Sequence, residues 1–77
     1  MTTILYVEDN EDNIYMLSRR LLREGFEVSI ARTGTEGVTM ARTTLPDLVI
    51  MDLSLPRMSG VEATRQIKTQ LPGTKVL

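Results

Sequence analysis

Acidic side chains follow two apolar segments that are typical of buried strands. Glu8 and Asp9 come directly after residues 4–7. Asp52 comes directly after a second such segment, residues 48–51. If the two strands are parallel neighbours, their carboxyl ends meet at one edge of the sheet, where ligands bind in open parallel sheets. The sequence therefore predicts an acidic pocket made by these three carboxylates.

The chemistry of such a pocket follows from the repulsion among its charges. A hard cation relieves that repulsion, and Mg²⁺ fits because it commonly binds one or two carboxylates, several waters and phosphate oxygens. The ion would also favour phosphoryl chemistry, in which an aspartate oxygen attacks phosphorus to give an acyl phosphate. Asp52 is the expected nucleophile, because the turn-rich residues 53–60 would expose it.

The composition narrows the classes of function. The 77 residues allow one small domain, and they include no cysteine and no histidine, so a thiolate metal site is excluded and the usual zinc ligand and general base are missing. A net charge of −1 gives no reason to expect nucleic acid or a membrane as partner. We see no signal peptide and no run near the ~18 apolar residues of a membrane span. We therefore expect a cytoplasmic protein.

The apolar pattern predicts the elements that would hold the pocket. The expected strands cover residues 4–7, 26–30, 48–51 and 75–77. The expected helices run from Asn10 or Glu11 to Glu24, from a capping box at Thr33, and from a second capping box at Ser59. Strands that alternate with helices and short connections are the signature of an open parallel α/β sheet.

Each expected helix has one apolar face. The faces consist of Ile14, Leu17, Leu21 and Leu22 in the first helix, Val38, Ala41 and Leu45 in the second, and Ala63, Ile67 and Leu71 in the third. Gly25 is placed to end the first helix. Gly37 inside the second helix costs about 1 kcal/mol relative to alanine, so we expect this helix to be the weakest element.

With these elements in place, the sequence resembles the receiver domain of bacterial two-component response regulators. The resemblance covers all 77 residues and rests on Glu8 and Asp9 after the first strand, Asp52 after the third, and the loop containing Pro56 and Gly60. It implies a flavodoxin-like fold with strand order 2-1-3-4. It also implies a phosphorelay function, in which a histidine kinase or a phosphotransfer protein donates a phosphoryl group to the chain.

The resemblance further implies a role for each site residue. Asp52 would be the phospho-acceptor and a Mg²⁺ ligand. Asp9 would bind the ion directly, Glu8 would bind it through water, and the backbone carbonyl of Ser54 would add a ligand. Pro56 and Gly60, named above, would shape the loop. Like receivers in general, the chain would be a signalling module rather than an enzyme.

Receivers continue through a complete fourth strand, two more helices and a fifth strand, and they carry a switch Ser or Thr and a Lys in that part. We therefore expect residues 1–77 to form a single truncated receiver-like domain. Loss of the fifth helix would partly uncover one set of strand residues: Leu5, Val7, Val49, Met51, Val76 and Leu77. An uncovered face beside an open strand edge favours pairing with another chain, so we expect a homodimer through this face or through the fourth-strand edge.

Other interpretations stay open. The chain could be a self-associating half-domain, a homodimeric folding unit whose acidic site is vestigial. An aspartate-nucleophile phosphatase is less favoured. Those enzymes have a pattern with a second Asp two residues after the nucleophile, and Ser54 occupies that position here. Glu11 and Asp12 are explained by the dipole of the first helix. The arginines of that helix are most simply a solvated face, although a kinase could dock there.

Overall fold

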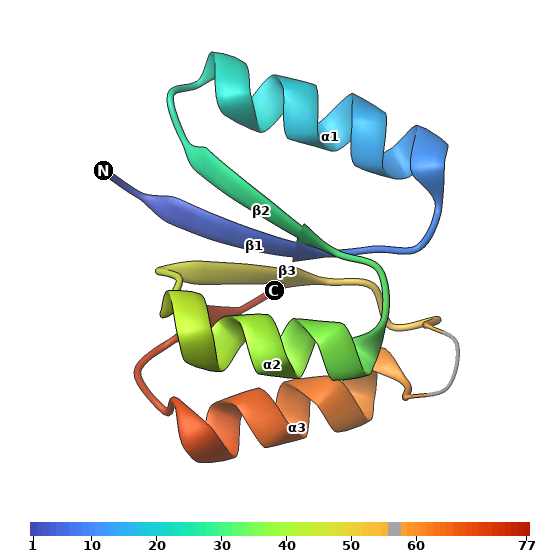
Figure 1. Cartoon of the computed structure of the whole chain (residues 1–77), viewed down its shortest axis with the longest axis vertical. Coiled ribbons are helices and arrows are strands. Elements are labelled where there is room, and N and C mark those ends of the chain that lie inside the picture. Colours follow the sequence, from blue (N-terminus) through green and yellow to red (C-terminus); the bar gives the residue numbers. More distant parts are fainter. Residues whose placement is uncertain (56–57) are drawn as a thin grey trace.

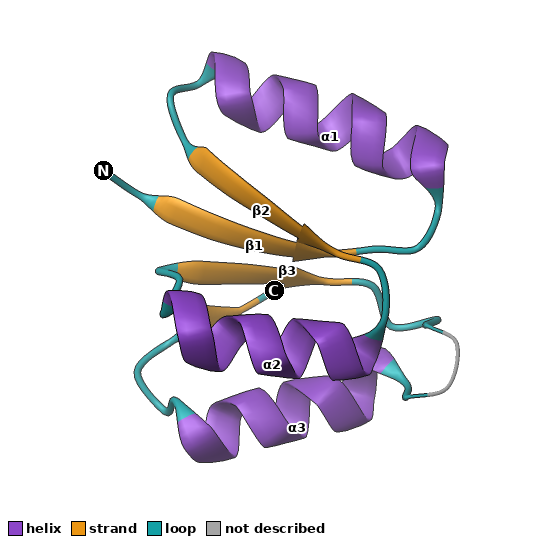
Figure 2. Ribbon diagram, viewed as in Figure 1, coloured by secondary structure: helices purple, strands orange, loops and turns teal. Residues whose placement is uncertain are grey.

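The computed structural model describes residues 1–55 and 58–77 of the chain. Within them, four strands alternate with three helices. Figures 1 and 2 show how these elements are arranged. The elements are β1 (Thr3–Val7), α1 (Glu11–Arg23), β2 (Glu27–Ala31), α2 (Gly34–Thr44), β3 (Leu48–Met51), α3 (Gly60–Gln70) and β4 (Lys75–Val76). The second strand lies one residue later than the sequence pattern predicts. Every helix in the described part of the chain falls short of the length and apolar character that a membrane span requires.

All the strand pairs are parallel, and the sheet order is β2-β1-β3-β4. This confirms the predicted flavodoxin-like α/β fold with strand order 2-1-3-4. β1 lies between β2 and β3, with Val7 opposite both Ala31 and Met51. The carboxyl ends of β1 and β3 are therefore adjacent, which is the condition that the predicted pocket requires.

The other ends of β1 and β3 are joined by a clamp of hydrogen bonds. The backbone N–H of Thr3 donates to Asp47 Oδ2 at 2.8 Å, and the N–H of Asp47 donates to the carbonyl oxygen of Thr3 at 2.9 Å. The two residues are 44 positions apart in the sequence. The clamp fixes the register of β1 against β3 from the side opposite the pocket.

The sheet carries α1 on one face and both α2 and α3 on the other (Figure 1). The core lies mainly under α2 and α3, where Leu5, Val7 and Val49 are completely buried and Met51 is 7% exposed. These four residues are among those that we expected to be partly uncovered, and that prediction is wrong. Side chains alternate between the faces of a strand, and this set faces the side that carries two helices.

The partly uncovered residues lie on the opposite face, under α1. There Ile4 and Tyr6 are buried beneath the helix, whereas their partners in register on β3, Leu48 and Ile50, stay partly exposed. Leu77, beyond β4, is 74% exposed. The partly covered face is therefore the one under α1, and of the six strand residues that we expected to be uncovered Leu77 alone is exposed.

The predicted caps of the helices are present. Thr33 Oγ1 accepts a hydrogen bond from the N–H of Glu36, and Ser59 Oγ accepts one from the N–H of Glu62. Asn10 caps α1 in the same way, through the N–H of Asn13. These side chains satisfy backbone N–H groups that have no partner within the helix. Gly25 follows α1 with φ of 91°, as expected for a glycine that ends a helix.

Two of the predicted apolar contacts are wrong. Leu22 is 57% exposed on α1, and Leu45 is 64% exposed where it caps α2 in the left-handed conformation, with φ of 49°. The helical stripe does not continue through Leu45, because the left-handed backbone turns its side chain away from the core. Gly37 also has a role that helix propensity does not reveal. A Cβ at this position would lie 2.9 Å from a buried Val7 methyl group, so the glycine lets α2 approach the sheet closely.

Candidate functional site

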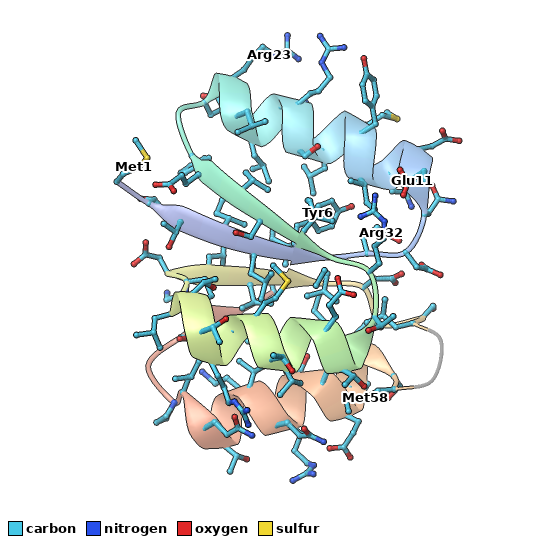
Figure 3. The ribbon with its side chains drawn as sticks, viewed as in Figure 1. Met1, Tyr6, Glu11, Arg23, Arg32 and Met58 are labelled. Atoms are coloured by element: carbon cyan, nitrogen blue, oxygen red, sulfur yellow. The ribbon has the colours of Figure 1, made fainter. Side chains whose placement is uncertain are left out.

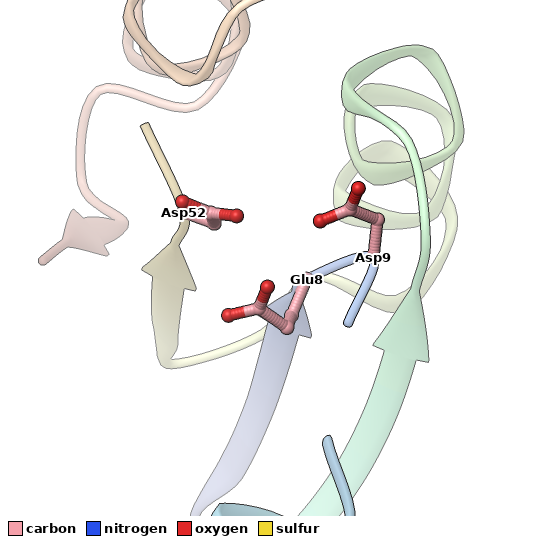
Figure 4. A group of neighbouring side chains, drawn as sticks. All are labelled: Glu8, Asp9 and Asp52. Carbon is pink, nitrogen blue, oxygen red and sulfur yellow. The ribbon is translucent and has the colours of Figure 1, made fainter. Parts of the chain in front are cut away.

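Three carboxylates meet at the carboxyl edge of the sheet (Figure 4). Glu8 and Asp9 follow β1, and Asp52 follows β3. Each residue offers one carboxylate oxygen, and these oxygens all lie within 4.8 Å of one another. Glu8 is buried, Asp52 is partly buried and Asp9 is exposed. The structure thus brings together the three side chains that the sequence analysis placed in one pocket.

The backbone at both strand ends is fixed by the last hydrogen bonds of the sheet. The N–H of Glu8 donates to the carbonyl oxygen of Ala31 at 2.9 Å. The N–H of Asp52 donates to the carbonyl oxygen of Val7 at 3.0 Å. The second bond joins the ends of β1 and β3, so the backbone positions from which Glu8 and Asp52 project are set by the sheet rather than by a loop.

The carboxylates of the pocket repel one another. Two unit charges at this separation repel by about 1–4 kcal/mol, at dielectric constants between that of water and that of a protein surface. In the part of the chain that the structure describes, the ion pairs join Arg32 to Glu11 and Arg65 to Glu62, both at 2.6 Å, and neither involves the pocket. A cation is therefore the natural complement, and an all-oxygen donor set suits a hard ion such as Mg²⁺.

Glu8 is held by a donor on each carboxylate oxygen. The hydroxyl of Tyr6 donates to Oε1, and the backbone N–H of Asn10 donates to Oε2, both at 3.3 Å. Burial, together with the nearby charges of Glu8 and Asp52, raises the pKa of Tyr6 to about 12. The hydroxyl therefore keeps its proton near neutral pH and remains a donor.

Sequence reasoning missed Tyr6 as a residue of the site. A signal was present, because Tyr6 precedes Glu8 by two positions, and residues i and i+2 of a strand share a face. Figure 3 shows the Tyr6 side chain between β1 and α1, in the same region as Glu11 and Arg32. Glu11 forms its ion pair with Arg32 and is not part of the pocket. This agrees with the sequence analysis, which explained Glu11 by its place at the start of the first helix.

The loop after β3 orients Asp52. The N–H of Ser54 donates to Asp52 Oδ1 at 3.0 Å, in an Asx turn that fixes the carboxylate. Leu53 and Ser54 are both exposed, so the loop leaves the aspartate accessible. Pro56, to which the resemblance assigns part of the loop shape, lies outside the described residues.

Two glycines allow the loop to pack where it does. A Cβ on Gly60, the first residue of α3, would overlap the carbonyl oxygen of Asp52 and lie 2.5 Å from Leu53 Cα. A Cβ on Gly34, the first residue of α2, would lie 2.7 Å from the carbonyl oxygen of Met58. Both helices therefore begin against the segment that carries Asp52, and a side chain at either glycine would push that segment away.

Comparison with known proteins gives consistent matches. Residues 4–77 match the family model for the response regulator receiver domain. Protein PilH of Pseudomonas aeruginosa is 40% identical over 67 residues, which are 87% of this chain and 55% of that protein. The polar-differentiation response regulator DivK of Brucella ovis is 38% identical over 66 residues, which are 86% of this chain and 54% of that protein. The chain spans about half the length of these two relatives.

Solved structures agree with the sequence matches. A response regulator receiver domain protein from Clostridium thermocellum has a TM-score of 0.93 at 29% identity, over 99% of this chain and 62% of that one. A chain from the structure of histidine kinase ThkA in complex with response regulator TrrA gives 0.92 at 32%, over 99% and 66%. A receiver domain of a Pseudomonas aeruginosa sensor histidine kinase, with magnesium coordinated in its active-site cleft, gives 0.88 at 35%, over 94% and 59%.

Proposed function

We propose that this chain, which belongs to the response regulator receiver domain family, binds Mg²⁺ in its acidic pocket and accepts a phosphoryl group on Asp52. The observation that carries the proposal is the convergence of Glu8, Asp9 and Asp52, whose carboxylate oxygens lie within 4.8 Å of one another at the ends of adjacent strands. The role is that of a signalling module in a phosphorelay, not of an enzyme with turnover of its own.

The donor set fits a magnesium ion. Asp9 and Asp52 would bind it directly, Glu8 would bind it through water, and the backbone carbonyl of Ser54 would complete the protein ligands. When bound, the ion supplies positive charge that balances the phosphoryl oxygens and favours attack by a carboxylate. The exposure of Asp9 supports this arrangement, because an ion that keeps several waters needs an open side.

Asp52 would act as the nucleophile. Its carboxylate is oriented by the Ser54 N–H and stands at the end of a strand, so it does not have to be moved into place. One carboxylate oxygen forms a bond to phosphorus while the bond from phosphorus to the phosphohistidine nitrogen breaks. The electron pair of that bond stays with the imidazole, which takes up a proton, and Asp52 becomes an acyl phosphate.

The proposed phosphodonor is a histidine kinase or a phosphotransfer protein in the cytoplasm. The exposed side of α1 supports a protein contact, because Tyr15 and Met16 are 60% and 70% exposed. They line a shallow groove with Arg19, Arg20 and Arg23. Apolar surface next to basic side chains suits a partner with an apolar ridge and acidic flanks. The net charge of −1 gives no support for nucleic acid or an anionic membrane as partner.

Mass spectrometry and calorimetry test the function together. We expect a Mg²⁺-dependent mass gain of one phosphoryl group from acetyl phosphate, absent in Asp52→Asn. We expect Asp9→Ala to weaken Mg²⁺ binding by about tenfold or more, as loss of a direct ligand would. Asp12→Asn is the matched control, because Asp12 is an exposed acid outside the pocket. A mass gain that survives in Asp52→Asn, or turnover of a phosphate ester, would contradict the proposal.

Self-association is a second candidate function, in which the acidic site would be vestigial. It is favoured by the partly exposed Leu48 and Ile50 and by the exposed Leu77 on the α1 face. Within the described residues, β4 pairs with β3 alone. Light scattering across a range of concentrations should then give the mass of a dimer, and Ile50→Lys should lower it. The mass of a single folded chain at all concentrations would rule this candidate out.

A further inference from the structure

We propose that the Tyr6 hydroxyl is a positioning group for the metal pocket, which it serves by holding the carboxylate of Glu8 in the orientation that faces Asp9 and Asp52. The inference rests on the proposed function, because it concerns the same pocket. Tyr6 would not touch the ion or the phosphoryl group. Its effect would pass through Glu8, whose Oε1 accepts its hydrogen bond at 3.3 Å.

The strand geometry places the two residues together. Tyr6 lies on the α1 face of β1, and Glu8 continues the same face one step beyond the strand. The hydroxyl oxygen is also 3.5 Å from the carbonyl oxygen of Asn13, in the first turn of α1. A hydroxyl has one proton to donate, and the charged carboxylate is both the closer and the stronger acceptor. The proton therefore goes to Glu8.

The second oxygen of Glu8 is held from the start of α1. Oε2 accepts the backbone N–H of Asn10, the residue whose side chain caps the helix. The carboxylate is thus held between the strand below it and the helix beside it, with one donor on each oxygen. A carboxylate has about four lone-pair sites, so each oxygen can still accept a water molecule of a hydrated cation.

Burial makes this hydrogen bond matter. Tyr6 is 5% exposed and Glu8 is 8% exposed, so water does not readily replace the hydroxyl. A phenylalanine in place of Tyr6 would keep the ring and its packing but leave Oε1 without its buried donor. Glu8, repelled by the other two carboxylates and held by the N–H of Asn10 alone, would then rotate more readily away from the position in which it can accept a metal-bound water.

The test is a double-mutant cycle on Mg²⁺ affinity, measured by calorimetry with Mg²⁺ alone as the probe. We expect Tyr6→Phe to raise the Mg²⁺ Kd by about tenfold, the low end of the effect of residues that orient metal ligands. In a Glu8→Gln background, the same substitution should change the Kd much less, because a group that acts through the Glu8 carboxylate has then lost its target. A merely structural role would give the same factor in both backgrounds.

Tyr15→Phe is the matched control. The Tyr15 hydroxyl is exposed and bonded to Arg19, so its removal should leave the Mg²⁺ Kd unchanged. The ¹³C resonance of the Glu8 carboxyl carbon in metal-free protein provides a second readout, which should shift in Tyr6→Phe and stay in place in Tyr15→Phe.

The outcomes separate the two proposals. If the unmodified chain binds Mg²⁺ and Tyr6→Phe binds it equally well, the positioning role is overturned while the proposed function stands. If the Glu8 carboxyl resonance does not shift in Tyr6→Phe, the proposed hydrogen bond from Tyr6 to Glu8 is contradicted. If the folded, unmodified chain binds no Mg²⁺, the proposed function fails and the positioning role fails with it.

Discussion

On the face of the sheet that α2 and α3 cover, Leu5, Val7 and Val49 are completely buried, whereas on the face under α1 their neighbours Leu48 and Ile50 remain partly exposed. The first face is an apolar core that α2 approaches closely at Gly37. The second face combines apolar contacts with a tyrosine hydroxyl and a buried carboxylate. The contrast suggests that one side of the sheet supplies most of the stability, while the other side can hold polar groups next to the pocket.

The largest effect should come from filling the tight contact at the start of α3. Gly60→Ala places a Cβ against the backbone of Asp52 and Leu53, which cannot give way as a flexible side chain can. We expect a loss of about 3 kcal/mol in the free energy of unfolding, or more, measured by urea denaturation. Gly73→Ala is the control, since nothing lies within 4 Å of its added Cβ. Equal stability of the two variants would show that the loop is not tightly packed.

A matched pair of truncations compares the two faces directly. Leu5→Ala removes a completely buried side chain and should cost about 3 kcal/mol. Ile50→Ala removes a partly exposed one and should cost about 1 kcal/mol, because part of its surface is already in water. Urea unfolding of both variants provides the measurement. If Ile50→Ala cost as much as Leu5→Ala, the division of stability between the faces would be wrong.

Gly37→Ala tests how closely α2 approaches the sheet, and it does so by the sign of the effect. Helix propensity alone predicts a gain of about 1 kcal/mol from alanine. The contact at 2.9 Å with Val7 predicts the opposite, a net loss of about 1 kcal/mol, because overpacking in a core outweighs that gain. Thermal unfolding distinguishes the two signs, and a stabilised variant would contradict the close packing of α2.

The Tyr6 hydroxyl, on the α1 face, should make the free energy of unfolding depend on pH in the alkaline range. Its folded-state pKa of about 12 lies above the value of 10.0 for the free side chain, so the folded chain binds the proton more tightly. The associated stability is fully present below pH 10 and is lost as the pH rises from about 10 to 12. Tyr6→Phe should lack this alkaline loss in pH-dependent urea unfolding. An unchanged slope in that range would show that the hydroxyl is not sheltered.

Much of this architecture could be predicted because the signals are local. Apolar runs followed by acids indicate strand ends. Thr33 and Ser59 cap their helices by accepting hydrogen bonds from residues three positions later. The strand order came from the resemblance and is confirmed. The roles of Asp52 as acceptor and of Ser54 as a metal ligand stay predictions, as does the extent of the domain.

The remaining features depend on contacts between distant segments. Alternation shows that Leu5 and Ile4 face opposite sides, but which side carries two helices is decided by the path of the whole chain. The close approach at Gly37 depends on Val7, thirty positions earlier. Leu45 matched the helical period, yet the left-handed turn after α2 removed it from the core.

The clamp between Thr3 and Asp47 has a consequence for the order in which the chain folds. Its partners are 44 positions apart, and closing a loop of that length costs about 3 kcal/mol of chain entropy before any contact compensates. Pairing of β1 with β3 is therefore a slow, non-local step compared with forming any helix. Because the pocket joins Glu8 and Asp9 to Asp52 across that same pair of strands, it exists only after this step. In a refolding experiment, binding of a cation to the pocket would therefore report the time at which β1 and β3 have paired.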